Sequence, residues 1–306
     1  MDKIITQIVN CHSKLFGLNP CIEKINVGFT NTLYKVNDSY IIKICTDKSN
    51  EKEFKQEINF YNSNKENSLI PKLYYANLEK TEVPYFYEIL EKVNGVSLFN
   101  VWHTFIEEER ENVVKEICSA MKQMHNVKGT SYDWSKFLKK RYNSLFRKIK
   151  PLNIFSKEEI SLLNRAYLLF DKYLKSDEFV LVHNDLHFDN IIVNNGKIKI
   201  IDFERSMYAP KDFELDIIYR MIRKPWKFAS EETEKYTNKG DYSNIMTYIS
   251  RYYPELFTVP SLSKRLAIYD IVYFLNQLLL YPSLYELKND VLLAASNVVA
   301  NNNILN

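Results

Sequence analysis

The stretch that decides the fold is His183-Asn184-Asp185-Leu186-His187-Phe188-Asp189-Asn190, together with Asp202-Phe203-Glu204 shortly after it. Between them, the β-branched runs Ile191-Ile192-Val193 and Ile198-Lys199-Ile200-Ile201 flank the turn residues Asn194-Asn195-Gly196. This pattern predicts a β-hairpin. Because a hairpin returns the chain on itself, we expect Asn190 at its start and Asp202 past its end to face one site.

Asp185, Asn190 and Asp202 are the residue types that phosphoryl transfer requires. The reaction needs a carboxylate that orients the attacking hydroxyl and accepts its proton. It also needs oxygen ligands that hold Mg²⁺ against the transferring phosphate. The order Asp, Asn and Asp across a hairpin supplies that set.

Two other interpretations of this stretch stay open. Asp and Asn beside a hairpin are ordinarily satisfied surface groups, although this does not explain their ordered spacing. A metal hydrolase could use His183 and His187, which are four residues apart, together with Asp185, Asp189 and Asp202. No Glu follows the first His on a clear helix, which disfavours the hydrolase.

The distribution of residue types predicts an α+β fold with two lobes. Residues 20–92 are dominated by short β-branched and aromatic runs, with one amphipathic helix between Glu51 and Asn62. After the turn signal Asn94-Gly95, apolar residues recur at helical spacing, and Ser156 with Glu159 forms a capping box. We therefore predict a small N-terminal antiparallel-sheet lobe over residues 1–92 and a larger, mainly helical lobe over residues 93–306.

The sequence resembles the aminoglycoside phosphotransferase and choline kinase superfamily. The superfamily signature His-x-Asp-x-x-x-x-Asn, followed by Ile-Asp-Phe/Tyr-Glu/Gly, is matched at residues 183–190 and 201–204. The resemblance implies a protein-kinase-like fold that transfers the γ-phosphate of ATP or GTP, with Mg²⁺, to a hydroxyl of a small molecule. It implies that Asp185 is the catalytic base, that Asn190 and Asp202 are the magnesium ligands, and that His183 is structural.

The N-terminal lobe should bind the triphosphate. Gly28, Thr30 and Asn31 lie in the candidate phosphate loop Gly28-Phe29-Thr30-Asn31-Thr32-Leu33-Tyr34, whose single glycine departs from the Gly-x-Gly-x-x-Gly pattern. Lys43 lies among buried β-branched residues and needs a phosphate or carboxylate partner, unless it is a solvated strand lysine. We expect Glu57 to be its ion-pair partner, with Glu53 as the competing choice.

Two further expectations concern the segments on either side of the catalytic loop. The run Tyr87 to Lys92 should connect the lobes, so that backbone groups near Ile89 and Glu91 pair with the nucleobase. The segment Lys211 to Asp216 resembles the family's Asp-Pro-x-x-Asp-Leu, which implies that Asp216 ties the loop after Asp202 to the following helix.

The acceptor is predicted to be small, because the segment after Asp202 is short and no Ala-Pro-Glu follows it. Aminoglycosides, choline-like or ethanolamine-like amines and other metabolites all stay open, as does a catalytically silent binding module of kinase shape. Residues available for an acceptor pocket are Arg205, Tyr219, Trp226, Glu231, Glu232, Asp270 and Tyr273.

Composition excludes several other classes of partner. The 306 residues carry a formal charge of +3 from 41 basic and 38 acidic side chains, so no strong field favours nucleic acid or a membrane surface. Four single cysteines and a polar N-terminus predict a cytoplasmic protein without a signal peptide. The oligomeric state stays open.

Overall fold

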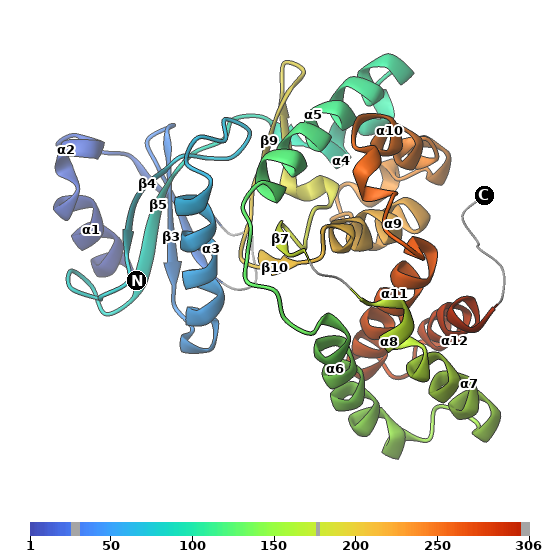
Figure 1. Ribbon diagram of the computed structural model, residues 1–306. Coiled ribbons are helices and arrows are strands. Elements are labelled where there is room, and N and C mark those ends of the chain that lie inside the picture. The colour runs from blue at the N-terminus through green and yellow to red at the C-terminus, as the bar shows by residue number, and fades with distance from the viewer. Residues whose placement is uncertain (26–30, 176–177, 301–306) are drawn as a thin grey trace.

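The computed structural model describes residues 1–25, 31–175 and 178–300 (Figure 1). Its N-terminal part, here called the sheet lobe, is built on a five-stranded antiparallel sheet in the order β1-β2-β3-β5-β4. The strands are β1 (Ile22–Ile25), β2 (Thr32–Val36), β3 (Tyr40–Cys45), β4 (Leu73–Asn77) and β5 (Phe86–Glu91). The predicted N-terminal sheet is confirmed.

Helices cover both faces of this sheet (Figure 1). Residues of α1 (Asp2–Cys11) pack with Ile42, Ile44, Tyr87 and Ile89, and α2 (Ser13–Phe16) adds Phe16 to the same cluster. On the other face, Phe54 and Ile58 of α3 (Glu51–Ser63) pack with Cys45 and Phe86. Because side chains alternate along a strand, Lys43 points to the face of α3. The sequence analysis predicted α3 but not α1 or α2.

Residues 92–95 lead from β5 into the remainder of the chain, here called the helical part. Its longer helices are α5 (Glu107–His125), α6 (Trp134–Ile149), α7 (Lys157–Leu168), α9 (Leu215–Arg223), α10 (Ile245–Tyr252), α11 (Leu262–Leu280) and α12 (Tyr285–Val299). Short helices are α4 (Leu98–Val101) and α8 (Phe170–Tyr173). Two small antiparallel sheets pair β7 (Val180–Val182) with β10 (Met207–Ala209), and β6 (Val96–Ser97) with β8 (Ile191–Asn194) and β9 (Lys197–Ile200). The predicted α+β, protein-kinase-like fold is confirmed.

Two local predictions, the hairpin and the capping box, are confirmed. The hairpin β8–β9 turns at Asn195 and Gly196, whose φ angles of 49° and 74° lie in the left-handed region that Asn and Gly tolerate. Ser156 caps α7, with Glu159 bonding back to the Ser156 amide. Among the residues that the structure describes, no helix is both long and apolar enough to cross a membrane.

Phe203 joins the segments that follow β7 and β9 to the sheet lobe. Its ring stacks on Phe60 of α3 with centroids 3.9 Å apart, and it meets Tyr61 edge-on at 5.4 Å. On its other side lies the ring of His183, at 4.7 Å. Phe203 is fully buried, so one core cluster spans α3 and the segments that follow β7 and β9.

Gly95→Ala is expected to destabilise the protein by about 1–3 kcal/mol, because this residue adopts a φ of 140°. An added Cβ would also lie 2.3 Å from the carbonyl oxygen of Val193 in β8. Urea unfolding measures the change, with Gly240→Ala as the control, since a Cβ there has its nearest neighbour at 3.6 Å. Equal stability of the two variants would contradict the strained geometry at Gly95.

Candidate functional site

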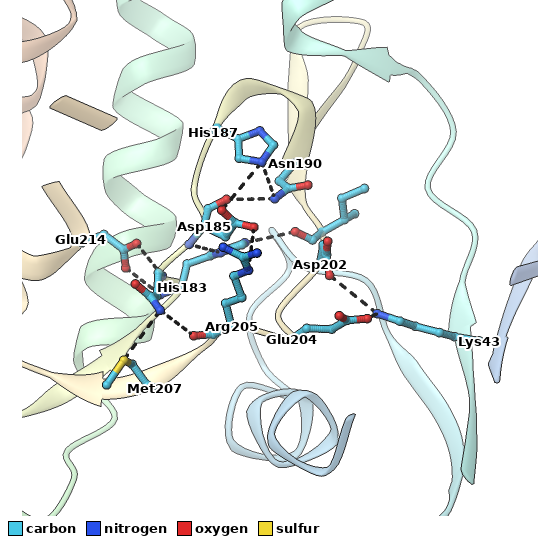
Figure 2. Close-up of polar contacts among 12 residues, drawn as sticks. Lys43, His183, Asp185, His187, Asn190, Asp202, Glu204, Arg205, Met207 and Glu214 are labelled. Carbon is cyan, nitrogen blue, oxygen red and sulfur yellow. Dashed lines mark hydrogen bonds and ion pairs between the residues drawn. The ribbon is translucent and has the colours of Figure 1, made fainter. Parts of the chain in front are cut away.

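His183 fixes the loop between β7 and β8 from within the core. Its Nδ1 accepts the backbone N–H of Asp185 at 3.2 Å, and its Nε2 donates to the carbonyl oxygen of Ile201 at 3.1 Å (Figure 2). Both ring nitrogens are therefore engaged with backbone groups, and the imidazole is neutral with its proton on Nε2. His183 has a structural position, and neither nitrogen is available to a metal.

The carboxylate of Asp185 has two nitrogen-bearing neighbours (Figure 2). The Nε2 atom of His187 lies 3.9 Å from Oδ1, and Nε of Arg205 lies 3.7 Å from Oδ2. Neither contact is a hydrogen bond at these distances. Burial lowers the pKa of His187, against the opposing charge of Asp185, so the neutral ring accepts the Asn190 amide at 3.3 Å. Asp185 thus keeps acceptor capacity for a hydroxyl.

Asn190 and Asp202 present oxygen atoms near this carboxylate. The Asn190 side chain donates through Nδ2 to the carbonyl oxygen of Asp185 at 2.9 Å, which directs Oδ1 away from that bond. Asp202 follows β9 with a φ of 65°, a sparsely populated conformation for a residue with a side chain. An amide oxygen and a carboxylate oxygen are the hard ligands that Mg²⁺ prefers. The donor set fits the predicted ion.

Lys43 lies opposite this pair in a cluster of carboxylates. Its Nζ atom is 2.6 Å from Glu57 Oε2, 2.6 Å from Glu204 Oε1 and 3.7 Å from Asp202 Oδ1. Burial opposes the charge of this lysine, but the surrounding carboxylates outweigh it and raise its pKa. The structure thus brings the predicted pair Lys43 and Glu57 together, while Glu53 is exposed. Sequence reasoning missed Glu204.

The other described residues that were predicted to bind the nucleotide are not gathered at one place. Gly28 and Thr30 lie outside the described residues, and Asn31 donates to Glu204. Ile89 is fully buried at the centre of the sheet, with its side chain on the α1 face rather than the Lys43 face. Glu91 accepts hydrogen bonds from Lys199 Nζ at 2.6 and 2.7 Å and from the Lys72 amide at 3.0 Å. The Glu91 side chain therefore links β5 to β9.

Glu214, which the sequence did not single out, holds the loop between β7 and β8. Its carboxylate accepts the backbone N–H groups of His183 at 2.8 Å and Asn184 at 3.3 Å (Figure 2). It also lies 3.4 Å from the ring of His125. Asp216 instead pairs with Arg220 within α9. The role that the resemblance implies for Asp216, tying the loop after Asp202 to the following helix, stays a prediction.

Ion pairs occupy the side of the helical part where acceptor residues were expected. Arg220 bonds Asp216 at 2.7 Å, and Arg223 bonds Asp270 of α11 at 2.6 Å. The guanidinium of Arg220 also lies 3.6 Å from Asp270. Tyr273 stacks against Arg220, with the guanidinium 3.9 Å from the ring centroid. The two carboxylates of this network are therefore neutralised by two arginines.

Comparison with known proteins gives a family and a fold. Residues 22–239 match the model of the phosphotransferase enzyme family. A protein LicA homolog of Mycoplasma capricolum subsp. capricolum is 29% identical over 195 residues, which are 63% of this chain and 69% of the relative.

Among solved structures, ADP-bound aminoglycoside phosphotransferase APH(2'')-Ib superposes with a TM-score of 0.68 and 16% identity, covering 96% of this chain and 99% of the other. The gentamicin complex of APH(2'')-IIa superposes with a TM-score of 0.64 and 17% identity, covering 97% and 96%. At these identities the superpositions show that the fold is shared.

Proposed function

Because the chain belongs to the phosphotransferase enzyme family, we propose that it is a Mg²⁺-dependent kinase that transfers the γ-phosphate of ATP or GTP to a hydroxyl of a small molecule. The observation that carries the proposal is the convergence of Asp185, Asn190, Asp202 and Lys43 from three separate segments on one site. These segments are the loop between β7 and β8, which holds both Asp185 and Asn190, the segment that follows β9, and strand β3. Chance surface acids do not explain this convergence.

Each of these residues has a distinct role in the proposal. Asp185 orients the acceptor hydroxyl and accepts its proton as the oxygen attacks the γ-phosphorus, while the bond from the γ-phosphorus to the β–γ bridging oxygen breaks and ADP or GDP leaves. Lys43, held by Glu57, binds phosphate oxygens of the nucleotide. Asn190 and Asp202 would hold Mg²⁺, which supplies positive charge against the phosphate oxygens when bound. The carboxylates of Glu57, Glu204 and Asp202 around Lys43 make this part of the site suitable for a cation.

Gentamicin in a structural neighbour makes aminoglycosides the first acceptor class to test. A second class, small amino alcohols such as choline and ethanolamine, is favoured by the ion pairs of Asp216 and Asp270 with Arg220 and Arg223. An aminoglycoside carries several ammonium groups and needs several unpaired acids, whereas a choline-like amine carries one charge. Release of ADP or GDP across a panel of both classes distinguishes them.

Saturating ATP or GTP with Mg²⁺ is expected to stabilise the protein by about 2.7 kcal/mol at a hundredfold excess over Kd, because the ligand binds only the folded state. The shift should shrink when EDTA removes Mg²⁺. Thermal unfolding and calorimetry measure both effects. If neither nucleotide gives a shift or a heat with Mg²⁺ present, the kinase proposal fails, and failure to turn over any acceptor despite binding would favour the silent module.

A further inference from the structure

Glu88 is a buried carboxyl without an evident partner. It lies in β5, is 0% exposed, and neither of its oxygens has a hydrogen-bond partner among the described residues. In the sheet register it stands directly opposite Lys43 of β3. Directly opposed residues of antiparallel strands project to the same face, so Glu88 belongs to the cluster around Lys43.

The groups that face Glu88 come from three neighbouring elements. Glu57 and Tyr61 project from α3, Lys43 projects from β3, and Glu204 follows β9. The short contacts of Lys43, 2.6 Å each, go to Glu57 and Glu204. With Glu57, Glu204 and Asp202 already beside Lys43, an ionised Glu88 would therefore be a fourth carboxylate around one ammonium group, removed from water and without a donor. Such a charge is costly to bury.

A proton on Glu88 removes this buried negative charge. Glu88 stands opposite Lys43 in the sheet, and Lys43 contacts Glu57 at 2.6 Å, so the two carboxyl groups lie on the same side of the sheet beside one ammonium group. Two carboxylates can hydrogen-bond to each other only through a shared proton. The 2.6 Å contact with Lys43 identifies Glu57 as the ionised member. We propose that Glu88 is kept as a neutral carboxylic acid that donates a hydrogen bond to the Glu57 carboxylate, and that it thereby positions Glu57 against Lys43.

The electrostatic environment agrees with this assignment. Burial, and then the charge of Glu57, raises the pKa of Glu88 well above its usual value. Burial also raises the pKa of Glu57 to about 7, but Lys43 acts in the opposite direction on that group. Glu88 is thus a positioning residue for the nucleotide lysine, and only this part of the inference rests on the proposed function.

Glu88→Gln separates a neutral acid from a carboxylate. The amide has the shape of the protonated acid and still donates to Glu57, but it does not titrate. If Glu88 stays protonated in the folded state, the unfolded chain loses this proton above about pH 4.3 while the folded chain keeps it. The free energy of unfolding of the wild type should then fall with rising pH relative to the variant. We expect the melting temperature of Glu88→Gln to exceed that of the wild type by a margin that grows from pH 5 to pH 8.

Infrared spectroscopy of protein labelled with ¹³C-carboxyl glutamate provides an independent signal. The wild type at pH 8 should show the carbonyl stretch of a protonated carboxylic acid, and Glu88→Gln should lose it. No such band, together with a Glu88→Gln variant that is less stable than the wild type at pH 8, would overturn the proposal and indicate an ionised Glu88. Neither measurement requires nucleotide.

Glu88→Leu tests the positioning role. Leucine has no donor for Glu57, so Kd for Mg²⁺-nucleotide should rise on the order of tenfold, whereas Glu88→Gln should retain wild-type affinity. Equal affinity of the leucine and glutamine variants would refute positioning. If the wild type binds no nucleotide, the proposed function fails, while the infrared band and the pH-dependent stability still decide the state of Glu88.

Discussion

Asp185→Asn is expected to lower turnover by about 10²–10⁴-fold, the usual contribution of a general base, while nucleotide affinity stays nearly unchanged. Asparagine keeps the shape of the side chain but removes its charge and its basicity. In the proposed mechanism Asp185 faces the acceptor, and its side chain lies apart from Lys43 (Figure 2), so its loss should leave phosphate binding intact. Steady-state kinetics with an identified acceptor, together with calorimetry of nucleotide binding, measure the two quantities.

Asp189→Asn is the matched control, because it makes the same substitution four residues later in the same loop. The Asp189 carboxylate accepts a hydrogen bond from the Ser97 hydroxyl at 2.6 Å, and an asparagine oxygen can still accept it. We expect little change in turnover. A comparable loss of rate in both variants would show that loop structure, rather than the basicity of Asp185, is responsible.

Asp202→Asn should change the kinetics in a different way from Asp185→Asn. It removes a charged oxygen ligand, so the magnesium concentration for half-maximal activity should rise along with the loss of rate. A metal hydrolase would show another pattern, in which resting protein contains tightly bound zinc that is lost when His187 is replaced. Both ring nitrogens of His183 are already hydrogen-bonded to backbone groups, which argues against a metal hydrolase.

The sequence was most informative where chemistry depends on short-range spacing. The hairpin was readable because two β-branched runs flank Asn194-Asn195-Gly196, and its closure places Asn190 and Asp202 at one site. Glu57 was readable because α3 shows an apolar stripe that fixes which side chains face the sheet. In both cases the local periodicity of the sequence determines which way each side chain points.

The missed residues depend on contacts between distant segments. Glu204 meets Lys43, and Glu214 meets the loop at His183, only after β3, α3 and the helical part have packed together. No periodicity marks Glu214 as the acid that holds the loop at His183, because this contact forms only when the distant segments pack together. Likewise, α1 carries an apolar face, but the sequence alone did not show which surface it covers.

Arg265→Met is expected to destabilise the protein by about 3–5 kcal/mol, the cost of breaking a buried ion pair by removing one partner. Arg265 and Asp212 are each about 1% exposed, and the guanidinium bonds both carboxylate oxygens at 2.7 and 2.8 Å. It also donates to the carbonyl oxygens of Tyr173 and Lys175. Methionine fills part of the volume but leaves the Asp212 charge with the Tyr269 hydroxyl as its one side-chain donor among the described residues. Denaturant unfolding gives the free energy of unfolding.

Arg251→Met is the control for this prediction, because Arg251 also pairs with an acid, Glu111, but its side chain is 55% exposed and the pair is screened by water. We expect Arg251→Met to leave the free energy of unfolding almost unchanged. The double variant Arg265→Met with Asp212→Leu should recover part of the lost stability, since it removes the unpaired charge. Asp212 lies in the turn Lys211–Glu214, whose last residue holds the loop between β7 and β8, so Arg265→Met should also lower turnover, and the double variant should recover stability more than rate. A single variant as stable as the control would show that the Asp212–Arg265 pair does not hold this turn in place.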